Sequence, residues 1–221
     1  MSRRIRLSRT GRTLLFTAVA VFAVFLGSSS SRAQKPELSS VDSKDRIFHV
    51  RYPKSLLVCS HLDGENPDVW SPKECMAEIP VCDSSGHAGD VLMCLAYPSS
   101  EFRATSLQAA AFSVSRLQNL NAQECLHKWA RTDTANIHEE KIGGLAYRAA
   151  KSQETASSHV AEQSAYRISH NQACYELDVT LVTATDTAFA VEDAPRKITS
   201  MEREKILALL HQALAGFHFL K

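Results

Sequence analysis

Alternation between apolar and polar residues is most regular in residues 160–183, where two strand-like runs flank a turn-prone segment at 170–172. In the second run every other residue is apolar, which is the period of a half-buried strand. The apolar positions are Tyr175, Leu177, Val179 and Leu181, and the intervening positions are Cys174, Glu176, Asp178 and Thr180. The pattern predicts a long antiparallel hairpin with a dry face on the core and a wet face in solvent.

Four shorter segments also have strand patterns. Residues 47–58 alternate as far as Pro53, which has no N–H group and therefore predicts an edge strand or a bend. Residues 91–97 are a continuous apolar run, typical of a buried strand, and residues 105–117 pass from three alanines into an alternating pattern. Residues 142–149 combine a Gly-Gly turn with one more alternating strand.

The first of two predicted helices begins at a capping box. Asn121 is followed three residues later by Glu124, an arrangement in which each side chain binds a free N–H group of the first turn. On this helix Cys125 and Trp129 would be four residues apart and would share a face. We therefore expect a helix held against the sheet by its tryptophan and its cysteine.

The second helix is the clearest one in the chain. Its capping box is Thr199 with Glu202, and Gly216 is the expected C-terminal cap. Apolar residues recur at helical spacing: Ile206, Leu209, Leu210, Ala213, Leu214 and Phe217. The order of strands, helix, strands and helix predicts an α+β fold, a single domain with a central antiparallel sheet flanked by helices.

Residues 1–33 have the pattern of a signal peptide. Five arginines precede a 13-residue apolar run at 14–26, and Ser31-Arg32-Ala33 fits the small-residue rule for cleavage. A membrane span needs about 20 residues, so we expect cleavage and no membrane span afterwards; an uncleaved anchor is the alternative. The expected location is therefore exported, in the periplasm or outside the cell.

The leader also hides the charge of the rest of the chain. It contains six of the 25 basic residues and none of the 24 acidic ones, so the remainder has a net charge of −5. This balance does not support a basic surface for nucleic acid, and we expect no nucleic-acid partner. Residues 34–45 are rich in Ser, Lys and Asp and are predicted to be flexible, whereas residues 46–221 should form the folded domain.

Six cysteines follow the leader, and an even number behind an export signal predicts up to three disulfides. They are Cys59, Cys75, Cys82, Cys94, Cys125 and Cys174. The sequence alone leaves the connectivity open, but local spacing favours Cys75–Cys82, Cys59–Cys94 and Cys125–Cys174. These bonds would make residues 59–94 a disulfide-stapled insert. No two cysteines have the close spacing of a zinc or redox pair, which favours structural disulfides.

Four short motifs resemble the PsbP-like superfamily, which includes the photosystem II extrinsic protein PsbP and bacterial DcrB-type envelope proteins. They are Phe48–Pro53, Ile142–Tyr147, Cys174–Leu177 and Phe217–Phe219. The resemblance implies an antiparallel sheet with helices on its faces, and a non-enzymatic accessory or binding role in an exported compartment. It supplies no catalytic residues. The cysteine-rich insert at 59–94 departs from the pattern and is where a function of its own could lie.

No catalytic, cofactor or metal motif is complete. The run at 138–142 lacks the second histidine of a zinc protease, and neither a nucleophile elbow nor a phosphate-binding loop is present. Glu176 and Asp178 share a strand face and could form a carboxylate pair, but alternation on a solvated face explains them. Of the nine histidines only His211 and His218 fall near each other on a predicted element. We therefore predict no catalytic residue, no cofactor and no metal ligand.

The leading hypothesis is an exported, non-catalytic domain that binds a protein partner or a small ligand in the cell envelope. One alternative is an exported hydrolase with its site in the 59–94 insert, for example at His61, Asp63 or His87. Another is a purely structural component of the envelope. These hypotheses differ in where the functional residues lie, and the fold shows which of those residues come together.

Overall fold

The computed structural model describes residues 37–59, 75, 81–82, 89–102, 104–129, 136–156, 158–185 and 195–221. The chain divides into two compact units, 1–35 and 36–221, and all described residues belong to the second. The predicted signal peptide and most of the predicted insert lie outside the described residues.

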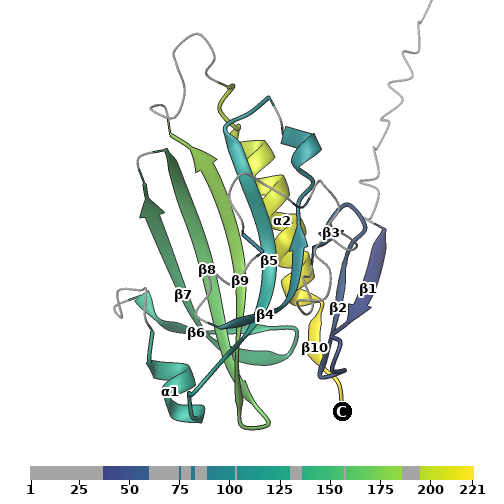
Figure 1. The fold of residues 1–221 in the computed structure, drawn as a ribbon, viewed down its shortest axis with the longest axis vertical. Helices are drawn as coiled ribbons and strands as arrows, with labels where there is room; N and C mark the ends of the chain where they lie inside the picture. The colour runs from purple at the N-terminus through teal and green to yellow at the C-terminus, as the bar shows by residue number, and fades with distance from the viewer. Residues whose placement is uncertain are drawn as a thin grey trace, which may run out of the picture. The chain divides into compact units, whose positions relative to one another are not determined.

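Seven antiparallel strands form the larger sheet, in the order β3-β4-β5-β9-β8-β7-β6 (Figure 1). Their bounds are β3 (Leu57–Val58), β4 (Asp90–Ala96), β5 (Leu107–Leu117), β6 (His138–Ile142), β7 (Leu145–Thr155), β8 (His159–His170) and β9 (Ala173–Ala184). The predicted hairpin is confirmed as β8 and β9, which pair from His159 with Ala184 to His170 with Ala173. Asn171 and Gln172 both have positive φ, as a two-residue hairpin turn requires.

A second, three-stranded sheet has the order β1-β2-β10 and consists of β1 (Leu38–Asp42), β2 (Phe48–Pro53) and β10 (Phe217–Phe219). Residues 38–42 lie in the segment predicted to be flexible, and that prediction is wrong for them. The polar composition of this segment suggested disorder, but residues 38–42 form a strand that pairs with β2 along its whole length.

The edge-strand prediction for Pro53 is also wrong, because β2 is the middle strand of its sheet. Backbone groups of β2 alternate between its two neighbours: Arg51 donates to Gly216 on the β10 side, and Lys54 donates to Glu37 on the β1 side. Pro53 therefore faces the β10 side, where the last strand pair is Phe217 with Val50. Its missing N–H breaks no hydrogen bond of the sheet.

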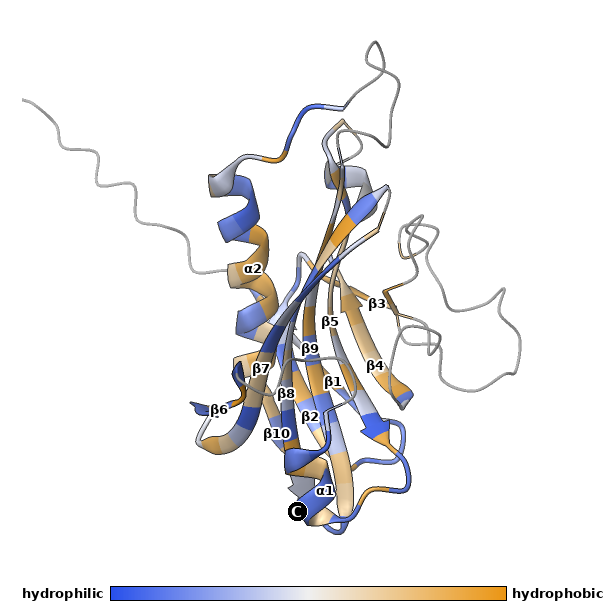
Figure 2. Cartoon of the chain, turned by 90° about the vertical axis from the view of Figure 1, so that its left-hand side faces the viewer, coloured by the Kyte–Doolittle hydropathy of each residue, from blue (hydrophilic) through white to orange (hydrophobic). Residues whose placement is uncertain are grey.

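Helix α2 (Ser200–Ala215) lies between the two sheets, in contact with β2 on one and with β5 and β9 on the other. Its hydrophobic side faces the strands (Figure 2). The predicted dry face of the hairpin is confirmed, and the core joins helix and strand residues: Tyr175, Leu177, Val179, Leu181, Ile206, Leu210, Ala213 and Leu214, among others. A side chain at Gly216 would collide with the Arg51 carbonyl, so glycine is required where α2 turns into β10.

Helix α1 (Ala122–His127) begins at the predicted capping box but is short. It ends before Trp129, which therefore does not share a helix face with Cys125 as predicted. The α+β class and the antiparallel pairing are confirmed, whereas a central sheet flanked by helices is found only in part. α2 packs on β5 and β9 of the larger sheet, and the short α1 lies against β8 and β9. A short 3₁₀ helix, η3 (Ser99–Phe102), precedes β5.

Candidate functional site

All six cysteines are joined in disulfides, with a connectivity that differs from the predicted one in two of three bonds. Cys125–Cys174 is confirmed, with a Cα–Cα distance of 5.4 Å. The other bonds are Cys59–Cys75 and Cys82–Cys94, in place of Cys59–Cys94 and Cys75–Cys82. Three disulfides are typical of proteins in oxidising compartments outside the cytoplasm, which supports the exported location to that extent.

The reason for the two wrong pairings lies at the junction of β3 and β4. Cys59 and Cys94 do lie opposite each other, since the Cys59 N–H donates to the Cys94 carbonyl at 2.8 Å. The backbone already joins these strands, and each cysteine instead binds a cysteine of the insert. The two bonds fasten the insert separately to the end of β3 and to β4. His61, Asp63 and His87 lie outside the described residues, so the hydrolase alternative stays a prediction.

Glu176 and Asp178 are buried, so the prediction that they line a wet face is wrong. Glu176 is 5% exposed and Asp178 0%. Arg167, 4% exposed, pairs across the hairpin with Glu176, its Nε donating to Glu176 Oε2. Gln163 Nε2 donates to Asp178 Oδ1 at 2.8 Å. Each carboxylate thus accepts a hydrogen bond from a side chain of the neighbouring strand β8.

The segment directly after α1 shields the Arg167–Glu176 ion pair from solvent. The Arg167 guanidinium donates to the Lys128 carbonyl and lies 4.2 Å from the centre of the Trp129 ring, a cation–π contact. Alternation along one strand predicts which residues share a face, but it does not show which distant segment covers that face.

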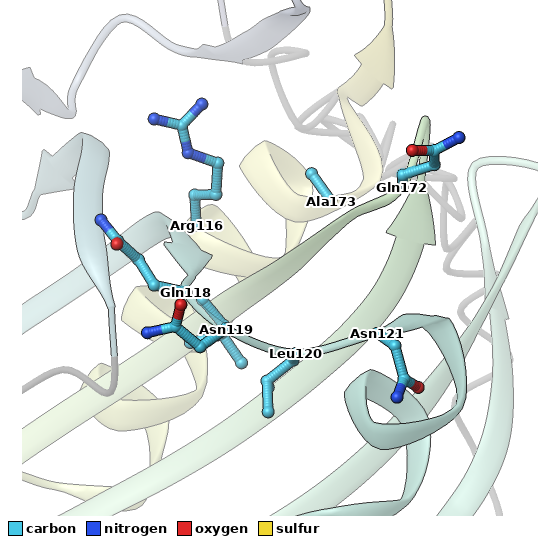
Figure 3. A pocket seen from close by; sticks show the side chains of 8 residues that line it. Arg116, Gln118, Asn119, Leu120, Asn121, Gln172 and Ala173 are labelled. Atoms are coloured by element: carbon cyan, nitrogen blue, oxygen red, sulfur yellow. The ribbon is translucent and has the colours of Figure 1, made fainter.

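A hollow opens where β5, the start of α1 and the β8–β9 turn meet, and we call it the amide hollow. Its volume is about 530 Å³, within the size range of ligand sites. Its lining combines one cation, four side-chain amides and three apolar residues: Arg116, Gln118, Asn119, Asn121, Gln172, Leu117, Leu120 and Ala173. Figure 3 shows Gln118 and Asn119 on one side of it and Gln172 on the other.

The fold places these amides by three separate constraints. Leu117 pairs with Cys174 and leads β5 out of the sheet beside the β8–β9 turn. The Cys125–Cys174 disulfide keeps α1 next to that turn. Asn119 and Gln172 both have positive φ, with values of 59° and 63°, so the backbone bends sharply on both sides of the hollow.

Several donors in the amide hollow are available to a ligand. The side-chain oxygen of Asn121 accepts hydrogen bonds from the N–H groups of Gln123 and Glu124. Its NH₂ group is therefore available to donate to a ligand. Gln118 donates to Asp90 and keeps its oxygen as an acceptor. Asp90, which accepts this bond, is also the β4 residue opposite Arg116, but neither Asp90 nor any other carboxylate is among the residues that line the hollow. The hollow therefore favours a carboxylate or a group of hydroxyls.

The sequence pattern did not predict this site. The available signal was three amide side chains within residues 118–121, next to a predicted capping box. That segment gave no indication that the turn at 171–172 lies beside it, because this neighbourhood depends on the register of β5 with β9.

A second, smaller cavity of about 170 Å³ lies between η3, the start of β5 and α2. Its charged lining residues are Glu101, Glu202 and Lys205. Glu202 already binds Arg196 at 2.7 Å and caps α2 through Thr199. Because that carboxylate serves the fold, the smaller cavity is the weaker candidate.

Neither a membrane-spanning helix nor a cluster of metal ligands is found in the described part of the chain. No helix there is long and apolar enough to span a bilayer. No group of three or more His, Cys, Asp or Glu side chains there is placed to hold a metal ion.

Comparison with protein-family models found no match, and neither did comparison with curated proteins. Solved structures that are similar to this chain include the cyanobacterial PsbP (CyanoP) from Synechocystis sp. PCC 6803, with 10% identity, 88% of this chain and 99% of that chain covered, and a TM-score of 0.40. A crystal structure from Bacteroides thetaiotaomicron VPI-5482 has 11% identity, 82% and 48% coverage, and a TM-score of 0.44. The chain thus spans about half the length of that protein.

One of these two structures is a PsbP, a member of the superfamily that the four sequence motifs resemble. At this level of identity and TM-score, neither likeness carries a role over to this chain.

Proposed function

We propose that this protein is an exported, non-catalytic binding domain, and that the amide hollow takes a small ligand or a peptide terminus bearing a carboxylate. One observation carries the proposal: a guanidinium and amide groups with available N–H donors line a hollow of about 530 Å³, and no carboxylate is among its lining residues. A site of this composition attracts an anion and can orient it by several hydrogen bonds. The proposed location is the periplasm or the cell exterior, which the three disulfides support.

Apolar residues complete the recognition. Leu117, Leu120 and Ala173 line the same hollow, and Leu117 and Leu120 belong to the cluster around the Cys125–Cys174 disulfide. An apolar floor beside polar donors is the usual composition of a small-molecule site. The ligand class that fits is therefore a carboxylate with an apolar or sugar-like body, which includes acidic sugars and free peptide C-termini.

The experiment is a binding screen by thermal shift, followed by calorimetry, with acidic sugars, their neutral counterparts, and one peptide in free-acid and amidated forms. We expect the free acids to bind and the neutral forms to bind at least 10-fold more weakly. Arg116→Gln should weaken binding by about 10-fold or more, because a hydrogen bond to a charged group contributes roughly 1.5–3 kcal/mol.

Asn121→Asp is the sharper variant. Aspartate accepts the same two N–H groups and keeps the helix cap, but it replaces the NH₂ donor with a negative charge. Binding of an anion should therefore be lost without loss of stability. Lys205→Gln, in the smaller cavity, is the matched control and should bind normally. Equal binding by the wild type, Arg116→Gln and Asn121→Asp would refute the proposal.

A further inference from the structure

A row of three side chains crosses the three-stranded sheet on the face turned away from the core. Asp42 on β1 pairs in register with His49 on β2, and His49 pairs with His218 on β10. Their neighbours Val50 and Phe217 alternate to the other face and are buried in the core. His49 keeps 21% and Asp42 55% of its side chain exposed, and His218 is exposed. The row is therefore open to solvent.

The two imidazoles lie against each other across the strands. Their ring centres are 4.8 Å apart and their planes are inclined by 50°. In a tetrahedral zinc site, the nitrogens of two histidine ligands lie about 3.3 Å apart, at about 2.0–2.1 Å from the ion. Two rings with centres 4.8 Å apart are close enough for one nitrogen of each to reach the same ion after side-chain rotation.

Hydrogen bonds on Nδ1 fix the tautomer of both rings. His49 Nδ1 lies 2.5 Å from Asp42 Oδ1, and His218 Nδ1 lies 3.3 Å from the Gly216 carbonyl oxygen. Since a carboxylate and a carbonyl can only accept, each Nδ1 is the donor, and each neutral ring has its lone pair on Nε2. Neither Nε2 has a hydrogen-bond partner among the described residues. Histidines that ligate metals are held by this kind of bond from the other ring nitrogen.

We propose that His49 and His218 bind one divalent first-row transition ion through their Nε2 atoms. Imidazole suits Cu²⁺, Ni²⁺ and Zn²⁺, and Cu²⁺ should bind most tightly by the general order of affinities. Asp42 is a positioning residue, which holds the His49 ring and raises its basicity. The chain supplies two ligands, and water completes the coordination. The site is independent of the amide hollow and survives if the proposed function fails.

Neither the spacing of histidines nor any motif predicts this site, and no metal ligand was expected from the sequence. The only histidine near His218 on a predicted element is His211, which lies on α2 and not on β10. The register of β10 with β2 creates the pair. A purely structural reading is that the rings pack as a cross-strand aromatic pair, and this reading predicts no change in metal affinity when either ring is replaced.

The experiment is calorimetry of the tag-free full chain with CuCl₂ and ZnCl₂, in a buffer that coordinates neither metal. Four variants are compared: His49→Gln, His218→Gln, Asp42→Asn and His211→Gln. His211 is the matched control, because it is also exposed and its Nδ1 also bonds a carbonyl, that of Leu207 at 2.8 Å. We expect one high-affinity ion per chain, at least 100-fold weaker binding in either pair variant, 10- to 100-fold weaker binding in Asp42→Asn, and wild-type binding in His211→Gln.

Electron paramagnetic resonance of the Cu²⁺-loaded wild type provides a second measurement that needs no variant. Nitrogen splitting from two imidazoles on one ion is expected, and splitting from a single imidazole would overturn the proposal. Unchanged affinity in both His49→Gln and His218→Gln, or an equal loss in His211→Gln, would also overturn it. Melting curves in EDTA verify that each variant is folded, because removal of a solvent-facing imidazole should leave the metal-free protein intact.

Discussion

The guanidinium of Arg167 lies 4.2 Å from the centre of the Trp129 ring and forms a buried ion pair with Glu176. This arrangement fastens the segment after α1 to the sheet. The same guanidinium donates to the Lys128 carbonyl, so one side chain joins β8, β9 and the end of α1. The contact explains why a strand face that alternates with the core is buried rather than wet.

Replacing one member of this ion pair should destabilise the fold strongly. Glu176→Gln keeps the shape of the side chain but leaves the Arg167 charge buried beside a neutral group. Breaking a buried pair in this way costs about 3 kcal/mol or more. Urea unfolding at neutral pH, followed by circular dichroism, measures the difference.

Two further variants make that result specific. Arg167→Met with Glu176→Leu removes both charges and should recover most of the loss, since apolar replacements of buried pairs are often neutral. Glu37→Gln breaks the exposed pair with Lys54 and should change stability by less than about 1 kcal/mol. A cost below about 1 kcal/mol for Glu176→Gln would show that the pair is not held as described.

How far the sequence predicted this molecule depends on the range of each contact. The dry face at Tyr175 and Leu177, the capping boxes and the hairpin follow from neighbours in the chain, and all were predicted correctly. The burial of Glu176 was not, because Lys128 and Trp129 cover it from a distant segment. The His49–His218 pair and the amide hollow were likewise missed, because strand register alone brings their residues together.

The Cys125–Cys174 disulfide should contribute more stability than the bonds that fasten the insert. It separates its cysteines by 49 residues, against 12 for Cys82–Cys94. In the chain-entropy description, these loops correspond to about 4 and about 3 kcal/mol. Paired Cys→Ala variants, compared by urea unfolding, should show the larger loss for Cys125 and Cys174. The reverse order would indicate that strain or packing, rather than loop length, dominates.

The connectivity itself can be checked without mutation. Proteolysis of the oxidised protein under non-reducing conditions, followed by mass spectrometry, should yield linked peptides for Cys59–Cys75 and Cys82–Cys94. Peptides that join Cys59 to Cys94, or Cys75 to Cys82, would instead support the pairing expected from local spacing. Reduction before digestion is the control, and it should abolish every linked peptide.

Acid sensitivity should arise in part at the start of α2. The hydrogen bond from Arg196, with those from the Thr199 backbone and hydroxyl, lowers the pKa of Glu202 from 4.5 to about 2. A carboxyl whose pKa is lowered in the folded state stabilises that state above its unfolded pKa. This contribution is therefore complete above about pH 4.5 and is lost as the pH falls towards 2. The stability difference between wild type and Glu202→Gln should shrink over this window, as measured by thermal melting.

Glu204→Gln, an exposed change on the same helix, is the control. A wild-type advantage over Glu202→Gln that stays constant from pH 6 to pH 2 would contradict the prediction.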